Sequence, residues 1–153
     1  IYDDRIVTSS NRIPVVADMA FGEFKASTSF GPCLPSDVMI FPGGMPGSAN
    51  LAAFKKLMDI MEQHYTEGGT VAAICAAPMV FGRIGILKGK RATCYPGCEG
   101  DLFGAEYTAA AVEQDGNIIT ACGPGASFDF GFAIIERFCG AGVAETLRSQ
   151  MQF

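Results

Sequence analysis

The chain has few basic side chains and no long apolar run. Its 153 residues include 11 Lys and Arg against 16 Asp and Glu, which gives a formal net charge of −5. This acidic balance disfavours non-specific attraction to nucleic acid or to an anionic membrane surface. No apolar run approaches the roughly 20 residues that a membrane-spanning helix needs. We therefore expect no nucleic-acid partner and no membrane partner, which leaves small neutral or carbonyl-bearing molecules as candidate ligands.

Histidine is scarce, since His64 is the only one in the chain. It stands beside Gln63 on the predicted polar side of an amphipathic helix, so we predict a solvated surface side chain. A Cys-His dyad for nucleophilic catalysis is therefore not expected. Any proton acceptor must be a carboxylate or a group outside the sequence shown.

The chain also lacks the features that would make its six cysteines structural. Its first residues show neither the basic nor the apolar region of a signal peptide, so we expect reduced thiols and a cytosolic protein rather than disulfides. Zinc is disfavoured because Cys94 and Cys98 are the only close pair and no second pair accompanies them. No metal site is predicted.

The apolar content, 49% of 153 residues, suffices for one core and is too small for two, so we predict a single domain over residues 1–153. Strands are expected at residues 5–8, 13–16, 38–41, 70–74, 107–113 and 117–122. Pro14 predicts an edge strand, the run at 38–41 predicts a central parallel strand, and Asp115-Gly116 predicts the turn between the last two strands. Helices are expected at 51–65 with Ser48 or Asn50 as cap, from Pro78, at 128–138 and at 142–151. Alternating strands and helices predict an α/β fold with a doubly wound, mostly parallel sheet.

Cys75 is the candidate nucleophile, because it lies between the buried strand at 70–74 and a helix starting near Pro78. A sharp strand-to-helix turn lifts such a side chain clear of the sheet, and helix N-terminal amides stabilise a thiolate. Thiol pKa values fall to roughly 3.5 to 7.5 in such settings. An ordinary buried cysteine is the alternative interpretation.

Other strand ends supply candidate binding groups. The glycines at 43 and 44 follow the strand at 38–41, and the amides of Gly44 and Ala76 are candidates for an oxyanion hole; a plain turn at the glycines is the alternative. Tyr95 is placed to line the same pocket, unless it is a packed core side chain.

Three segments resemble the ThiJ/PfpI superfamily, in the branch of the Parkinson disease protein deglycase and glyoxalase III. They are residues 38–51 (VMIFPGGMPGSANL), 71–78 (VAAICAAP) and 115–125 (DGNIITACGPG) followed by Ser127-Phe128. The resemblance implies a flavodoxin-like three-layer fold, a homodimer, and Cys75 as nucleophile and oxidation sensor. It also implies cofactor-free conversion of glyoxal or methylglyoxal to a hydroxy acid, repair of glycated amines, and protection against oxidative stress.

The sequence also departs from the superfamily pattern. Protease-like relatives carry histidine directly after the nucleophile, where this chain has Ala76, so peptidase activity is not expected. Several relatives have a histidine where Tyr95 stands, and a common threonine is replaced by Ala126. The first strand and helix of the superfamily carry an acid that hydrogen-bonds the thiol, and we expect this chain to start after that unit. A redox-sensing chaperone, in which Cys75 forms a sulfinate without turnover, and an interaction module without activity are the alternative functions.

Overall fold

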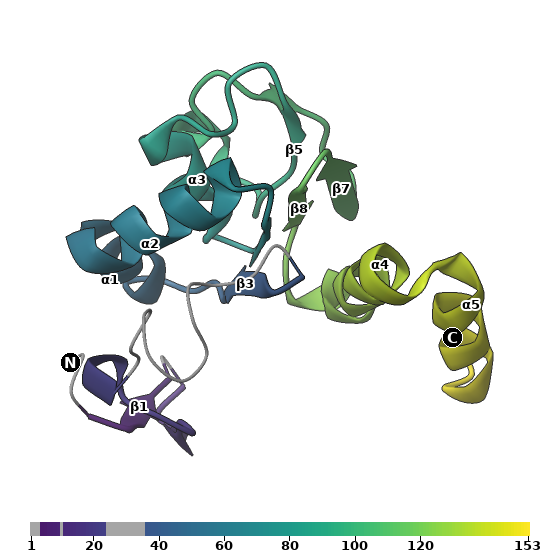
Figure 1. Cartoon of the computed structure of the whole chain (residues 1–153), viewed down its shortest axis with the longest axis horizontal. Helices are drawn as coiled ribbons and strands as arrows, with labels where there is room; N and C mark the ends of the chain where they lie inside the picture. The colour runs from purple at the N-terminus through teal and green to yellow at the C-terminus, as the bar shows by residue number, and fades with distance from the viewer. Residues whose placement is uncertain (1–3, 10, 24–35) are drawn as a thin grey trace. The chain divides into compact units, whose positions relative to one another are not determined.

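The computed structural model describes residues 4–9, 11–23 and 36–153. The chain divides into two compact units, Ile1–Leu34 and Pro35–Phe153 (Figure 1). In the first, strands β1 (Ile6–Thr8) and β2 (Pro14–Val16) pair antiparallel and are followed by a 3-10 helix (Phe21–Glu23). The two short strands are as predicted, and Pro14 lies on an edge strand, as does every residue of a two-stranded sheet.

The second unit is built on a four-stranded sheet in the order β3-β4-β8-β7. Its strands are β3 (Val38–Phe41), β4 (Thr70–Ile74), β7 (Val112–Asp115) and β8 (Ile118–Ala121). The first three in the spatial order are parallel, with Ile40 opposite Ala72 and Ala72 opposite Ile119, while β7 forms an antiparallel hairpin with β8. A small parallel pair, β5 (Arg91–Ala92) and β6 (Glu106–Tyr107), completes the strands described.

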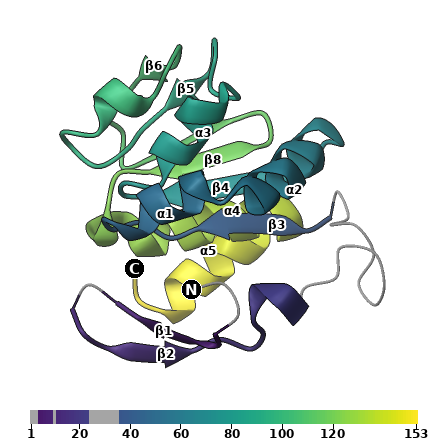
Figure 2. The same cartoon turned by 90° about the vertical axis from the view of Figure 1, so that its left-hand side faces the viewer.

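Helices cover both faces of this sheet (Figures 1 and 2). They are α1 (Gly47–Ala53), α2 (Lys55–Thr66), α3 (Pro78–Ile84) and α4 (Ser127–Cys139), while α5 (Ala141–Gln150) packs against α4. Along β4 the buried side chains alternate: Val71 and Ala73 join the core under α1 to α3, while Ala72 joins the core under α4. A period of two is what a strand buried on both faces requires. The doubly wound, mostly parallel sheet is therefore confirmed, and no helix in the described residues is long and apolar enough to cross a bilayer.

Several details differ from the prediction. Among the described strands β3 lies at the end of the sheet and not at its centre, and Ile40 is half exposed. The helix expected at 51–65 is two helices that meet at Phe54, and neither has a side-chain cap at its start. Ser48 lies inside α1, where its hydroxyl donates to the Gly44 carbonyl. The first hairpin arm is shorter than 107–113, because Tyr107 pairs in the small sheet with β5.

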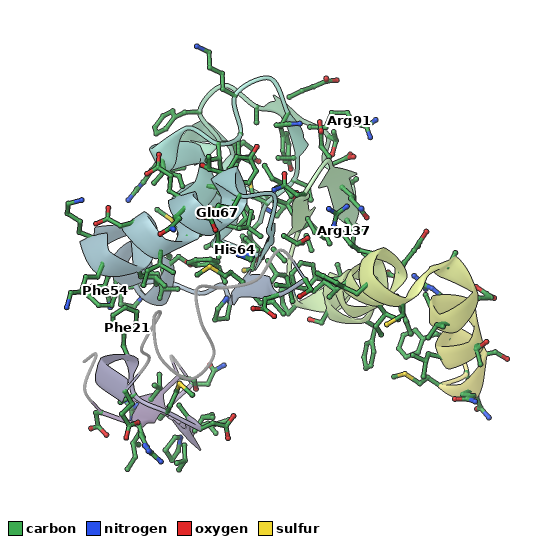
Figure 3. The ribbon with its side chains drawn as sticks, viewed as in Figure 1. Phe21, Phe54, His64, Glu67, Arg91 and Arg137 are labelled. Carbon is green, nitrogen blue, oxygen red and sulfur yellow. The ribbon has the colours of Figure 1, made fainter. Side chains whose placement is uncertain are left out.

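The prediction of a solvated His64 is wrong. Its side chain is 2% exposed, and its ring lies so close to Gly69 that a Cβ there would be 2.1 Å from Cε1. The Nε2 atom lies 3.2 Å from the Thr70 carbonyl oxygen, which can only accept, so Nε2 carries the proton. On the other face of the sheet Arg137 donates to the Thr70 hydroxyl (Figure 3). His64 thus joins the end of α2 to the start of β4.

We expect His64→Ala to lower the free energy of unfolding by about 2 to 4 kcal/mol, because it leaves a cavity and an unsatisfied carbonyl. Urea unfolding measures the change. Gln63→Ala is the matched control, since Gln63 is the exposed neighbour on the same helix, and it should cost little. Equal effects of the two substitutions would contradict a structural role for His64.

Candidate functional site

Three loops meet where the parallel strands end. Strands β3, β4 and β8 run in the same direction and are adjacent, so their carboxyl ends share one edge of the sheet. Gly43 and Gly44 follow β3, Cys75 follows β4, and Cys122 follows β8. Ligands of open parallel sheets bind at this edge. The sequence-predicted candidates are thus brought together in one place.

Cys75 occupies a sharp turn between strand and helix. Its φ is +65°, a left-handed conformation that costs a residue with a Cβ about 1 to 2 kcal/mol. Hydrogen bonds on both sides hold it there: its N–H donates to the Ala121 carbonyl, and its carbonyl accepts from the Tyr95 N–H, both at 2.9 Å. Helix α3 then begins with Pro78 in its first turn. The predicted elbow is present, and Cys75 is partly exposed as a free thiol.

Gly43 lies against the elbow so closely that no side chain fits. A Cβ added there would be 2.4 Å from the Cys75 Cβ and 2.6 Å from the Ile74 carbonyl oxygen. Non-bonded atoms in proteins do not come this close to one another, so the loop after β3 approaches Cys75 only because residue 43 is glycine. Gly43 thus lets the loop after β3, which carries the Gly44 N–H, lie in contact with the elbow.

The conformation of the next residue, Gly44, is held by hydrogen bonds to its carbonyl group. Its φ is +91°, and its carbonyl accepts hydrogen bonds from both the N–H and the hydroxyl of Ser48. In the described part of the chain, neither the Gly44 N–H nor the Ala76 N–H donates to another protein atom. Unpaired backbone donors beside a nucleophile are available to an oxygen of a bound ligand.

Tyr95 lies beside the elbow as well as bonding to it. Its ring packs on the bare face of Gly123, where an added Cβ would be 3.2 Å from Cδ2. The side chain is 49% exposed, so Tyr95 is not the packed core residue that was its alternative interpretation. The aromatic ring and the glycine after β8 thus lie next to the strand that presents Cys75.

Two further thiols, Cys94 and Cys98, lie near enough to Cys75 to interact with it electrostatically. From the sequence they were considered only as a possible zinc pair. Cys94 is fully buried, and burial together with nearby negative groups raises its pKa to about 12. Burial also raises the pKa of Cys98, with the charge of Cys75 as the next cause. Both groups therefore stay protonated at neutral pH. Within the described residues, no group of three or more Cys, His, Asp or Glu is arranged to hold a metal ion.

The acids near this end of the sheet are engaged elsewhere. Both carboxylate oxygens of Glu99 accept from the Gly97 N–H, which lowers the pKa of Glu99. Asp101 forms an ion pair with Arg83. In the described ranges the Cys75 sulfur makes no hydrogen bond to a carboxylate.

Comparison with known proteins gives one consistent result. The model of the DJ-1/PfpI family matches residues 2–137. The Parkinson disease protein 7 homologue of Danio rerio is 35% identical over 120 residues, which cover 76% of this chain and 64% of that protein. A deglycase of Pyrococcus abyssi is 30% identical over 122 residues, which cover 78% of this chain and 69% of that protein. The chain thus spans slightly less than two thirds of the Danio rerio relative.

Solved structures agree. A DJ-1 superfamily protein of Salmonella typhimurium, crystallised as a cysteine-to-alanine mutant, superposes with a TM-score of 0.85 at 30% identity, covering 98% of this chain and 78% of that one. The oxidized DJ-1 of Toxoplasma gondii gives a TM-score of 0.87 at 27% identity, covering 99% and 79%.

Proposed function

The chain belongs to the DJ-1/PfpI family, and we propose on that premise that it is a cysteine-dependent, cofactor-free enzyme acting on small α-oxoaldehydes. Conversion of methylglyoxal to lactate is the reaction we propose, with a protective role in oxidative stress. The observation that carries the proposal is the elbow: Cys75 is held at φ +65° beside two backbone N–H groups without protein partners.

In the proposed reaction the Cys75 thiolate adds to the aldehyde carbon, and the carbonyl oxygen becomes an anion. The N–H groups of Gly44 and Ala76 are the donors we assign to that oxygen, and Gly43 lets their loop come close. A proton then moves from the aldehyde carbon to the neighbouring carbon, which converts the adduct to a thioester. The acceptor we propose for this proton is a carboxylate other than Glu99 and Asp101, or a group outside the sequence shown, because those two acids are engaged elsewhere. Water releases lactate and restores the thiol, so the sum is methylglyoxal plus water giving lactate.

Tyr95 completes the assignment as a wall of the substrate site. Its exposed ring packs on Gly123 and its N–H donates to the Cys75 carbonyl, so we assign the ring to the wall of the site beside the elbow. Ala76 offers no imidazole next to the nucleophile, which supports an aldehyde-directed reaction over peptide hydrolysis.

The test is enzymatic detection of lactate after incubation of the purified protein with methylglyoxal in buffer free of added metal and cofactor. Lactate above the rate of a buffer blank, in amounts exceeding the protein concentration, is the expected result. Consumption of one equivalent of aldehyde without further lactate would show a trap and not an enzyme, and would reject the proposal.

A second candidate function is a redox-sensing chaperone in which Cys75 becomes a sulfinate. Two observations favour it. The Cys75 thiol is partly exposed, and the nearby N–H groups of Gly44 and Ala76 are available to donate to sulfinate oxygens. The similar Toxoplasma gondii structure is of an oxidized protein. Protection of a heat-denatured client by the peroxide-treated protein, without aldehyde turnover, is its distinguishing result.

Family membership also supports three coarser inferences. We infer that both compact units belong to one domain, because the family model runs through residues 2–137. The homodimer that the resemblance implies is an inference of the same kind, whereas the cytosolic location stays a prediction from the sequence alone. Repair of glycated amines, which the resemblance implies, is a related reaction that we propose for the same thiol, and the Pyrococcus abyssi relative is named a deglycase.

A further inference from the structure

A tight turn connects Cys98 to Tyr95, whose backbone is hydrogen-bonded to Cys75. The Cys98 N–H donates to the Tyr95 carbonyl, and the Tyr95 N–H donates to the Cys75 carbonyl, both at 2.9 Å. Pro96 and Gly97, the latter with φ +96°, are the two central residues of the turn from Tyr95 to Cys98. This is the geometry of a type II turn, whose ends lie within about 7 Å of one another. Two hydrogen-bonded steps therefore connect the backbones of Cys75 and Cys98.

The three thiols near the elbow differ in access. Cys94 is fully buried and belongs to the core under α1 to α3, whereas Cys75 and Cys98 are both partly exposed. Cys122 packs against the other core, under α4. The charge on Cys75 contributes to the raised pKa of Cys98, which agrees with proximity of the two sulfur atoms. Cys98 and Cys122 are thus both partly exposed, and Cys98 is the one that the Tyr95 backbone connects to the Cys75 carbonyl.

We propose that Cys98 is a resolving cysteine, which converts an oxidised Cys75 into a reversible Cys75–Cys98 disulfide. In the first step hydrogen peroxide transfers one oxygen to the Cys75 thiolate, giving a sulfenic acid and hydroxide. In the second step the Cys98 sulfur attacks the Cys75 sulfur, an S–S bond forms, and the sulfenic oxygen leaves with the thiol proton as water. Peroxide is reduced, and two thiols are oxidised.

The turn is suited to supplying the movement that bond formation needs. A disulfide requires Cα atoms about 4.4 to 6.8 Å apart. Tyr95, Pro96 and Gly97 are all exposed, whereas the Cys98 side chain packs against the core under α1 to α3 and has to leave that contact. Besides the two backbone hydrogen bonds of Tyr95, the Gly97 N–H donates to the Glu99 carboxylate, which is an exposed contact. The disulfide would keep Cys75 from further oxidation to sulfinate and block its nucleophilic sulfur until it is reduced.

The test is peptide mapping after a short treatment with a small excess of peroxide, followed by alkylation of free thiols. Trypsin is expected to release Cys75 in the peptide 57–83 and the other three cysteines of this region in the peptide 92–137. The wild-type protein should yield these two peptides joined, with the loss of two hydrogen atoms, and dithiothreitol should separate them. Peroxide that adds two oxygens to Cys75 in the wild-type protein, with no joined peptide, would overturn the proposal.

Single substitutions assign the partner, since Cys94, Cys98 and Cys122 share the peptide 92–137. Cys98→Ser should lose the joined product, and its Cys75 should instead gain two oxygens that dithiothreitol does not remove. Cys122→Ser and Cys94→Ala are the matched controls, and both should still form it. Joined peptides in Cys98→Ser, or their loss in a control alone, would assign another thiol and contradict the inference. The assay needs no aldehyde turnover, so its outcome is independent of the proposed enzymatic reaction.

Discussion

Cys75→Ser is expected to abolish lactate formation from methylglyoxal, lowering kcat/KM by about 10³-fold or more. Serine fits the elbow as cysteine does, but its hydroxyl is not ionised at neutral pH, and no base hydrogen-bonds the Cys75 side chain in the described residues to activate such a hydroxyl. Initial rates at several methylglyoxal concentrations measure the effect. The fold should be intact, so the far-UV circular dichroism of the variant should match that of the wild type.

Cys139→Ser is the control for this substitution. Cys139 is an exposed free thiol at the end of α4, and its replacement should leave the rate unchanged. A Cys75→Ser variant that keeps a substantial fraction of the wild-type rate would mean that the reaction does not pass through this sulfur.

Gly43→Ala is expected to have the second largest effect, on stability and on reactivity together. The added methyl group would lie 2.4 Å from the Cys75 Cβ and 2.6 Å from the Ile74 carbonyl oxygen, and both belong to the rigid end of β4. These contacts can be relieved only if the backbone moves, and overpacking of this kind lowers the free energy of unfolding by about 1 to 3 kcal/mol. Urea unfolding should show a loss of this size, and iodoacetamide should modify Cys75 at a changed rate.

The matched control is Gly47→Ala, four residues further along the same loop and helix. Gly47 opens α1, and a Cβ there meets nothing within 4 Å, so alanine should be tolerated. If Gly43→Ala and Gly47→Ala unfold at the same urea concentration, the close approach of the glycine loop to the elbow is not a feature of the folded protein.

The sequence predicted the parts of the site that depend on local order along the chain. The apolar runs at 38–41 and 70–74 were identifiable because strands covered by helices on both faces are apolar throughout, and both runs are strands. Pro78 marked the first turn of α3 and so placed Cys75 on the elbow. Such signals lie within a few residues of the feature they predict.

The features that the sequence predicted wrongly depend on contacts between distant segments of the chain. An apolar run does not reveal its neighbours, so the end position of β3 among the described strands was not predictable from residues 38–41. His64 was assigned to the surface by its chemistry, although it follows the buried Met61 by three residues and therefore lies on the same side of α2. The absence of a side chain at Gly69, which makes room for the ring, was a second available signal.

Cys98 was missed for a related reason. Its spacing from Cys94 drew attention to a metal pair, while the Pro96-Gly97 turn that carries it back to the Tyr95 carbonyl was the informative feature. The pairing of Tyr95 with Cys75 joins residues 20 positions apart and has no local signature. Only the folded chain brings the two thiols to one end of the sheet.

The central claim is that the elbow holds the Cys75 sulfur accessible and reactive, and the rate of its alkylation by iodoacetamide at neutral pH tests this most directly. Cys139, exposed at the end of α4, is the internal reference measured in the same samples. We predict that Cys75 is alkylated faster than Cys139, because the elbow presents its sulfur beside backbone N–H groups that have no protein partner. Equal rates at the two cysteines would contradict the account.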